Sequence, residues 1–348
     1  MTGKGIAAME RQPARASTHE NISAAPAVSL GFAHSSASDA VQLSQQTGDW
    51  NFEVSQLAKG PFNAECGALA LDSVNLLHIE ISRTVLQRGY GPRNMAAIFI
   101  PRPASPPVFA NGQLVEAGQC MTVMGGVLEG VSHSGYVELD LAFDLNACQS
   151  QLEELNGGSM GVQPGTTIAG PGPDWIADMS GRIDWLLKAA QEYGPALDNP
   201  RLRNNLTDHL LTAMVHFDAS TADLDSTTTR ATAARRVAVR LAREYIHAHL
   251  SESLPLSELC RHSGLKVRTL ETGFREITGL TPIAYIRSLR LNTVRRALHD
   301  AAANPRSISE IAMDNGFWHF GQFSLDYRKL FGETPTSTRR RGRASDIS

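Results

Sequence analysis

The chain has 348 residues, of which 42% are hydrophobic and 19% charged. This composition is typical of globular proteins and excludes disordered or fibrous chains, and the length favours two or more domains. The net charge of −3 hides an asymmetry, because residues 1–229 carry 12 Lys and Arg against 24 Asp and Glu, whereas residues 230–348 carry 20 against 11. An acidic body joined to a basic third indicates a partner such as nucleic acid.

Neither a membrane span nor a secretion signal is predicted. The longest clean apolar run, residues 95–100, is far shorter than the roughly 20 residues that a membrane helix needs. We therefore expect a cytoplasmic protein with no membrane partner. The cysteines have no metal-ligand spacing, which predicts buried thiols, no metal and no cofactor. They are Cys66, Cys120, Cys148 and Cys260.

The N-terminal part divides into a tail and a β-rich domain. Residues 1–40 are rich in Ala and Ser, which predicts a disordered tail. Residues 41–150 contain short apolar stretches separated by Gly, Pro and Asn, and LLHIEIS and VELDLAF alternate with the two-residue period of strands. We expect a barrel-like or sandwich-like domain with a pocket for a small ligand. Glu138 and Asp140 are predicted on the solvated face of their strand.

A Gly/Pro-rich connector, residues 156–173, follows this domain. Apolar residues at spacings of three and four then predict helices over residues 172–217, which serve as a connector or a dimerisation segment. The polar run 218–229 is predicted to be a flexible linker. The second domain is predicted over residues 230–343, where the charge changes sign. The fold class is therefore α+β, with a β-rich domain followed by an all-α domain.

The last third contains an internal repeat. LSELCRHSGLKVRTLETGFREITGLTP, which starts at Leu256, matches ISEIAMDNGFWHFGQFSLDYRKLFGETP, which starts at Ile308. Each copy has the pattern of a helix-turn-helix unit, with Gly264 or Gly316 supplying the positive φ of the turn. The segment PIAYIRSLRLNTVRRALHD predicts a connecting helix between the copies. Its outer face is predicted to carry Arg287, Arg290, Arg295 and Arg296.

This doubled pattern resembles the AraC/XylS transcription regulators over residues 235–343. The motifs that carry the resemblance are RLNTVRRAL in the connecting helix and EIAMDNGFWHFGQFSLDYRKLFGETP in the second unit. Within the family the chain is most similar to ethanolamine-operon-type regulators, on VRTLETGF and GETPTSTRRR. The resemblance implies a seven-helix domain whose two recognition helices enter successive major grooves of double-stranded promoter or operator DNA. It also implies a first domain that binds an unknown small-molecule effector or forms a homodimer, and RNA polymerase as a partner.

Residues for DNA contact are predicted on the outer faces of the two recognition helices and, for Arg290, on the connecting helix. Base-edge contacts set sequence choice, and phosphate contacts set affinity. Base contacts are predicted for Lys266, Arg268, Thr269, Thr272, His319 and Gln322. Phosphate contacts are predicted for Arg275, Arg290, Ser324, Arg328 and Lys329.

The sequence thus predicts a sequence-specific transcription regulator, an activator that responds to a small molecule, and not an enzyme. Two alternatives stay open. The first is a nonspecific DNA-packaging protein, whose binding would be dominated by charge. The second is an enzyme-derived N-terminal domain fused to a DNA-binding module, although the chain has no phosphate-binding glycine loop, no GxSxG elbow and no zinc deaminase motif.

Overall fold

The computed structural model describes residues 31–345 except 48–49, 93, 149–161, 163, 215–216, 218–229 and 301–305. Among these described residues, twelve strands form the N-terminal domain. They are β1 (Gly31–Ala37), β2 (Asn51–Gln56), β3 (Ala64–Leu71), β4 (Val74–Ile81), β5 (Val85–Tyr90), β6 (Met95–Pro101), β7 (Val108–Ala110), β8 (Gln113–Val115), β9 (Cys120–Met124), β10 (Val127–Ser132), β11 (Tyr136–Asp144) and β12 (Gly165–Ala169).

The strands form two antiparallel sheets that face each other as a sandwich. The order is β1-β3-β4-β11-β6-β9-β12 in the larger sheet and β2-β5-β10-β7-β8 in the smaller. The space between them is filled mainly by apolar side chains of both sheets, among them Val54, Val85, Phe99 and Val123. The α+β fold class with an N-terminal β-rich domain is therefore confirmed.

The domain begins earlier than predicted. Residues 31–37 form β1, which pairs with β3 along its whole length, and α1 (Ala40–Gln46) follows directly. The prediction of a disordered tail to residue 40 is thus wrong for residues 31–40, and residues 1–30 lie outside the described residues. The small side chains that suggested disorder fit this position, because Ala37 and Ala40 are almost fully buried. A second difference is β12, which forms from the predicted Gly/Pro-rich connector.

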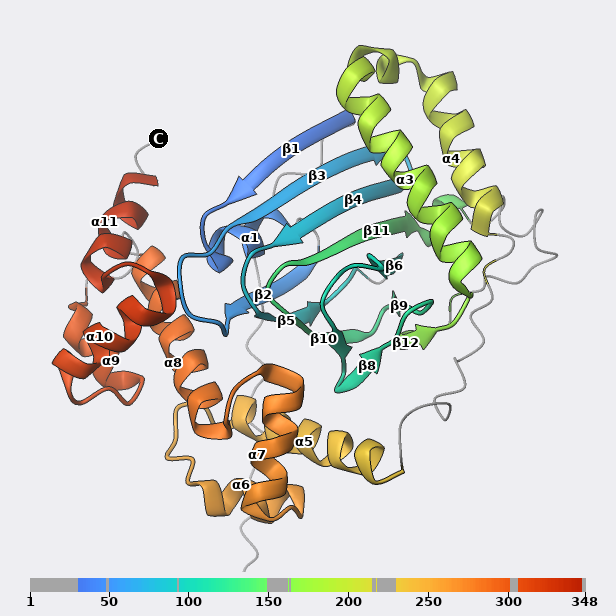
Figure 1. Cartoon of the computed structure of the whole chain (residues 1–348). Helices are drawn as coiled ribbons and strands as arrows, with labels where there is room; N and C mark the ends of the chain where they lie inside the picture. Colours follow the sequence, from blue (N-terminus) through green and yellow to red (C-terminus); the bar gives the residue numbers. More distant parts are fainter. Residues whose placement is uncertain are drawn as a thin grey trace, which may run out of the picture.

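The larger sheet is covered on both faces. Two helices, α3 (Pro173–Tyr193) and α4 (Pro200–Met214), pack on its outer face (Figure 1). Alternate residues of β11, such as Leu139 and Leu141, meet these helices, so the residues between them face the other sheet. Glu138 and Asp140 are therefore buried, with exposures of 3% and 4%. The prediction that they lie on a solvated face is wrong, because the second sheet covers their face of β11.

Seven helices form the C-terminal domain in the described part of the chain. They are α5 (Arg230–Ala248), α6 (Leu256–Ser263), α7 (Val267–Thr278), α8 (Pro282–His299), α9 (Ile308–Asp314), α10 (Phe320–Phe331) and α11 (Pro335–Ser345). They lie on the side of the sandwich away from α3 and α4 (Figure 1). Among the described residues we find no helix that is long and apolar enough to cross a membrane.

The sequence repeat is visible in the backbone. Gly264 and Gly316 have φ of 68° and 81° in the two turns, and Gly279 and Gly332 have φ of 72° and 76° after α7 and α10. Thr-Pro then starts the next helix in both copies. The left-handed backbone at four matched positions explains why the repeat keeps glycine there, since other residues are strained in this region.

The connecting helix α8 differs from the prediction on one face. Arg287 is exposed, but Arg295 is only 3% exposed and Arg296 pairs with Glu53 of β2 at 3.0 Å. The expected outer face thus packs partly against the sandwich. Helix α8 lies between both helix-turn-helix units and the N-terminal domain, so few of its positions reach solvent.

Candidate nucleic-acid interface

The first helix-turn-helix unit consists of α6 and α7. Leu259, Leu270, Phe274 and Ile277 are fully buried and join these helices to α5. The side chains predicted to contact DNA lie on the opposite side of α7, and every one of them is exposed. They are Lys266, Arg268, Thr269, Thr272 and Arg275.

Two local contacts organise this exposed face. The Thr272 hydroxyl donates to the Arg268 carbonyl at 2.8 Å, and Arg275 pairs with Glu271 at 3.5 Å. The Thr272 hydroxyl proton is thus already used, whereas no hydrogen bond or ion pair holds the Arg268 guanidinium in the described structure. The Arg268 side chain is therefore available to a partner, and the Glu271 carboxylate partly neutralises Arg275.

The second unit consists of α9 and α10. Helix α9 starts with a capping box, in which the Glu310 backbone N–H donates to the Ser307 hydroxyl and the Ser307 N–H donates to the Glu310 carboxylate. Phe317, Phe323 and Tyr327 are buried beneath the turn and α10. The predicted DNA-contacting side chains of this unit are again all exposed. They are His319, Gln322, Ser324, Arg328 and Lys329.

The exposed face of α10 is less available and more apolar than that of α7. The Gln322 side-chain amide donates to Asp326 at 3.0 Å, and Asp326 also pairs with Arg287 of α8. Trp318, just before α10, is 70% exposed, and Leu325 is 55% exposed. The sequence analysis did not identify either as an exposed apolar residue beside the predicted contacts.

Arg290 of α8 is the one predicted phosphate contact that lies outside the recognition helices. Its Nε donates to the Leu250 carbonyl at 3.0 Å, and its Nη2 donates to the Glu252 carbonyl. Partial burial lowers the pKa of this guanidinium. Arg290 thus ties the segment after α5 to α8, and its phosphate contact stays a prediction.

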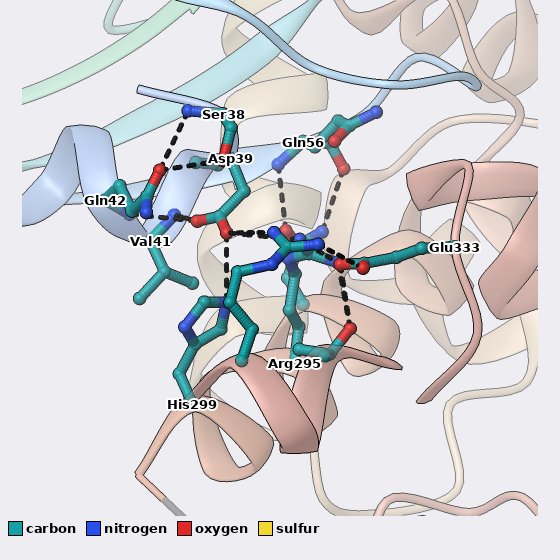
Figure 2. Close-up of polar contacts among 12 residues, drawn as sticks. Ser38, Asp39, Val41, Gln42, Gln56, Arg295, His299 and Glu333 are labelled. Carbon is teal, nitrogen blue, oxygen red and sulfur yellow. Dashed lines mark hydrogen bonds and ion pairs between the residues drawn. The ribbon is translucent and has the colours of Figure 1, made fainter. Parts of the chain in front are cut away.

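The N-terminal domain holds α8 through Asp39, the N-cap residue of α1 (Figure 2). Asp39 is 1% exposed, and its Oδ1 accepts the backbone N–H groups of Val41 and Gln42 at 2.9 Å each. Its Oδ2 lies 3.2 Å from Nη2 of Arg295 and 3.0 Å from Nε2 of His299, both on α8. One carboxylate therefore caps the N-terminus of a helix in the first domain and binds a helix of the second.

Residues Asp39, Arg295, His299 and Glu333 form what we name the Asp39 cluster (Figure 2). Glu333, at the start of α11, lies 2.7 Å from Nη2 of Arg295. Burial alone would raise the pKa of Asp39, but the hydrogen bond from His299 and the charges of Arg295 and His299 outweigh it and hold the pKa well below its usual range. The cluster is thus a contact between the domains in which each carboxylate faces a cationic partner.

Hydrogen bonds from Gln56 of β2 extend this contact. The Gln56 backbone N–H donates to the Asn292 side chain of α8 at 2.9 Å, and Asn292 donates back to the Gln56 carbonyl at 2.8 Å. The Gln56 side chain donates to the Leu330 carbonyl of α10 at 2.7 Å. The sandwich therefore touches α8 and the back of the second unit, while the predicted DNA-contacting side chains of α10 stay exposed.

A second buried ion cluster holds the first unit. Glu129 of β10 pairs with Arg243 of α5 at 2.7 Å and with Arg88 of β5 at 3.5 Å, and Arg243 is fully buried. Burial, together with the charges of Arg88 and Arg243, lowers the pKa of His247 to about 3, so its ring is neutral at pH 7. The Nε2 atom of this ring lies 3.0 Å from the Tyr285 hydroxyl. The sandwich thus contacts α5, which packs on the first unit, and the second unit, on sides away from the predicted DNA-contacting side chains.

The C-terminal helices match known proteins. Residues 259–341 match the family model described as a helix-turn-helix domain. The XylDLEGF operon transcriptional activator 3 of Pseudomonas putida is 31% identical over 166 residues, 48% of this chain and 49% of that protein. The XylDLEGF operon transcriptional activator 2 of the same organism is 40% identical over 95 residues, 27% of this chain and 60% of that protein.

A solved structure from Rhodopseudomonas palustris CGA009, described as a probable AraC family transcriptional regulator, is 32% identical over 30% of this chain and 96% of that chain, with a TM-score of 0.29. The chain spans 49% and 60% of the lengths of the two curated relatives. The finer resemblance to ethanolamine-operon-type regulators stays a prediction. Over its C-terminal helices, therefore, the chain is similar to AraC/XylS-type transcription activators, as the doubled helix-turn-helix pattern predicted.

Proposed function

We propose that this protein is a sequence-specific, DNA-binding transcription regulator that activates transcription in the cytoplasm. The observation that carries the proposal is the exposure of the same outer face on α7 and α10, in two units with matched turns, within a region that matches a helix-turn-helix family. Two recognition helices on one rigid connecting helix suit two major grooves on one side of a DNA duplex.

Base and phosphate contacts divide between the units. Arg268 has a free guanidinium that fits the two acceptors of a guanine edge, and Thr269 beside it suits a thymine methyl group. Gln322 suits adenine once its amide leaves Asp326. Arg328 and Lys329 lie further along α10 and suit phosphates. We therefore assign the greater part of the sequence preference to the first unit.

Control by an effector would act through the contacts between the domains. The Asp39 cluster and Glu129 fix both units against the sandwich, so a ligand that moves α1 or β10 changes the relative position of α7 and α10. Such a ligand shifts the balance between states that already exist. This arrangement favours an N-terminal domain that binds a small molecule and changes how well the two units fit DNA together.

Two protein partners belong to the proposal. The outer surface of α3 carries Trp185 and, at the C-terminal end of the helix, Tyr193, which are 64% and 66% exposed. Large exposed aromatic side chains are enriched in interfaces, so we assign this surface to a homodimer. RNA polymerase is the second partner, since an activator needs contact with it.

The experiment that tests the proposal is a selection of genomic fragments by the purified full chain, followed by salt titration on the recovered fragments. A recurring site of about two helical turns is expected. Recovery of fragments with no shared site, and with affinity set by salt alone, would replace the proposal by charge-driven DNA packaging.

A matched pair of variants sharpens this experiment. Arg268→Ala should weaken binding to the recovered site by about 1–3 kcal/mol and relax base preference at one position. Arg201→Ala, which removes an exposed arginine of α4 outside the interface, should leave affinity unchanged. An equal loss for Arg268→Ala on random DNA would reduce Arg268 to a phosphate contact.

A further inference from the structure

A small cavity lies between the two sheets of the sandwich. Its volume is about 60 Å³, and its walls come from β4, β6 and β11 of the larger sheet, β2, β5 and β10 of the smaller sheet, and α1. Most of the wall is apolar, but Glu138 and Asp140 of β11 also line it. We name it the acidic cavity after these two carboxyl groups.

The two carboxyl groups are unequally satisfied. The Tyr136 hydroxyl donates to Oε2 of Glu138 at 2.8 Å. Asp140 Oδ1 has no hydrogen-bond partner among the described residues, although Asp140 is 96% buried and borders the cavity. Buried polar atoms are almost always hydrogen-bonded, and exceptions point to a function or to a missing group. The free oxygen of Asp140 therefore indicates a ligand that donates hydrogen bonds.

No positive charge of the protein balances this pair. The side chains that line the acidic cavity in the described structure include no Lys, Arg or His. Burial raises the pKa of Glu138 to about 7, and burial together with the charge of Glu138 raises the pKa of Asp140 well above its usual range. Burial raises the pKa of Cys66, on β3, to about 11, and the charges of nearby carboxylates, Asp140 and Glu138 among them, add to this rise. The cavity thus favours a proton or another cation.

A larger cleft of about 510 Å³ between the sandwich and α5 differs in this respect. It carries charges of both signs that already pair with each other, such as Arg240 with Glu244 at 2.6 Å. Uncompensated charge is therefore a property of the acidic cavity and not of that cleft.

The rest of the cavity wall suits an organic cation. Trp50, Phe52 and Phe99 line it and contact one another, with ring centroids 5.8 to 6.5 Å apart. Aromatic faces attract cations and also pack against hydrocarbon. They offer no lone pairs to a metal ion, and no group of three or more metal-ligating side chains exists among the described residues.

We propose that the acidic cavity binds a small organic cation, a protonated amine whose ammonium group donates to Asp140 and Glu138 and whose hydrocarbon part packs against Trp50, Phe52 and Phe99. Only the role of this amine as the effector rests on the proposed function. The cavity volume limits the ligand to a few non-hydrogen atoms unless the walls move.

The same cavity is connected to the DNA-binding units. Leu43 and Thr47 of α1 line it, and the N-cap of α1 is Asp39, which binds Arg295 and His299 of α8. A ligand that displaces α1 therefore acts directly on the helix that joins the two units.

Calorimetric titration of the purified full chain with n-butylamine tests the proposal at pH 8. We expect saturable binding of n-butylamine, and no binding of 1-butanol or butyrate, which have similar hydrocarbon parts without the positive charge. Asp140→Asn should weaken binding about 10- to 100-fold, because it removes a charged acceptor. Glu80→Gln removes an exposed carboxylate of β4 and should leave binding unchanged.

The pH dependence gives a second readout. Affinity should fall as the pH is lowered from 8 to 6, because Glu138, whose pKa is raised to about 7, takes up a proton that competes with the amine. Tyr136 and Cys66, the other titratable groups beside Glu138 and Asp140, stay neutral over this range, since their pKa values are raised above the ordinary ones. Circular dichroism of Asp140→Asn establishes that a lost affinity does not come from unfolding.

Three outcomes would overturn the proposal: no heat from n-butylamine, equal binding of 1-butanol, or full affinity in Asp140→Asn. The DNA selection described above separates this failure from that of the proposed function. A recurring DNA site without amine binding overturns only the amine site, whereas amine binding without a recurring site supports the amine site and contradicts sequence-specific regulation.

Discussion

The sandwich contains two buried carboxylate sites with opposite surroundings. Asp39 is 1% exposed and lies within 3.2 Å of Arg295 and His299, while Asp140 is 4% exposed and has an oxygen without a partner in the described structure. Cationic neighbours lower the pKa of Asp39, and burial raises that of Asp140. The protein itself supplies cationic partners for the carboxylate of Asp39, but it supplies none for that of Asp140 in the described structure.

This difference separates a carboxylate that stabilises the fold, Asp39, from one that suits ligand binding, Asp140. A buried charge is tolerated when the fold itself supplies the opposite charge and the hydrogen bonds, as it does for Asp39. A buried carboxylate without them destabilises the folded state, so a protein that keeps one uses it for something else. The four predictions below test this distinction, from the largest expected effect to the smallest.

Asp39→Ala should produce the largest effect. It leaves Arg295 with Glu333 and removes the carboxylate that pairs with His299, and breaking a buried pair costs about 3–5 kcal/mol. Urea unfolding of the full chain measures this loss, and Asp39→Asn serves as a milder control because the amide oxygen can still cap α1. A loss below about 1 kcal/mol in Asp39→Ala would contradict a structural role for the cluster.

Asp140→Asn should have the opposite sign. The neutral amide does not carry the cost of a buried, uncompensated carboxylate, so the variant should gain about 1–3 kcal/mol of unfolding free energy at pH 8. Urea unfolding without amine measures the gain. A destabilised variant would mean that Asp140 has a structural partner, and the contrast with Asp39 would then disappear.

How much of this was predictable from the sequence can be judged on β11. The alternation of YVELDLAFD correctly predicted a strand, and it even separated Leu139 and Leu141 from Glu138 and Asp140. Alternation cannot tell which face meets water, because that depends on α3, α4 and the second sheet, which come from distant parts of the chain. The polar phase of β11 therefore faces the interior, against the general trend.

The C-terminal domain was more predictable, because its signals are local. Turn glycines, Thr-Pro helix starts and apolar spacing depend on neighbouring residues, and the repeat doubles each of them. Arg295 is an exception, because the sequence pattern predicted it on the outer face of α8 and the structure buries it. Its burial is set by Asp39, 256 residues away along the chain, and no local pattern reports such a partner.

The pH dependence of stability distinguishes the two sites by sign. The folded pKa of Asp39 lies below its unfolded value, so its contribution is present above the unfolded pKa, about 4, and is lost as the pH falls. The folded pKa of Glu138 is raised to about 7, so its contribution is present below about 4.5 and is lost as the pH rises toward 7.

The double variant Glu138→Gln/Asp140→Asn isolates the second effect. Between pH 5 and 7 the unfolding free energy of the unchanged protein should fall by about 1–2 kcal/mol relative to that of the double variant. Urea unfolding at several pH values gives both curves. Parallel curves would show that the two carboxyl groups bind the same number of protons in the folded and unfolded states, and would contradict their raised pKa values.

Arg341→Ala should have the smallest effect, and it marks the edge of the Asp39 cluster. The Arg341 guanidinium lies 3.6 Å from Oδ2 of Asp39 and also pairs with Glu333, but its side chain is 41% exposed. Solvent screens exposed ion pairs, so the loss should stay below about 1 kcal/mol and shrink further at high salt. Urea unfolding of Arg341→Ala and Asp39→Ala at low and high salt makes the comparison. A loss for Arg341→Ala as large as that for Asp39→Ala would place the energy of the cluster in its exposed rim, whereas the expected small loss assigns it to the contact of Asp39 with Arg295 and His299, which solvent hardly reaches.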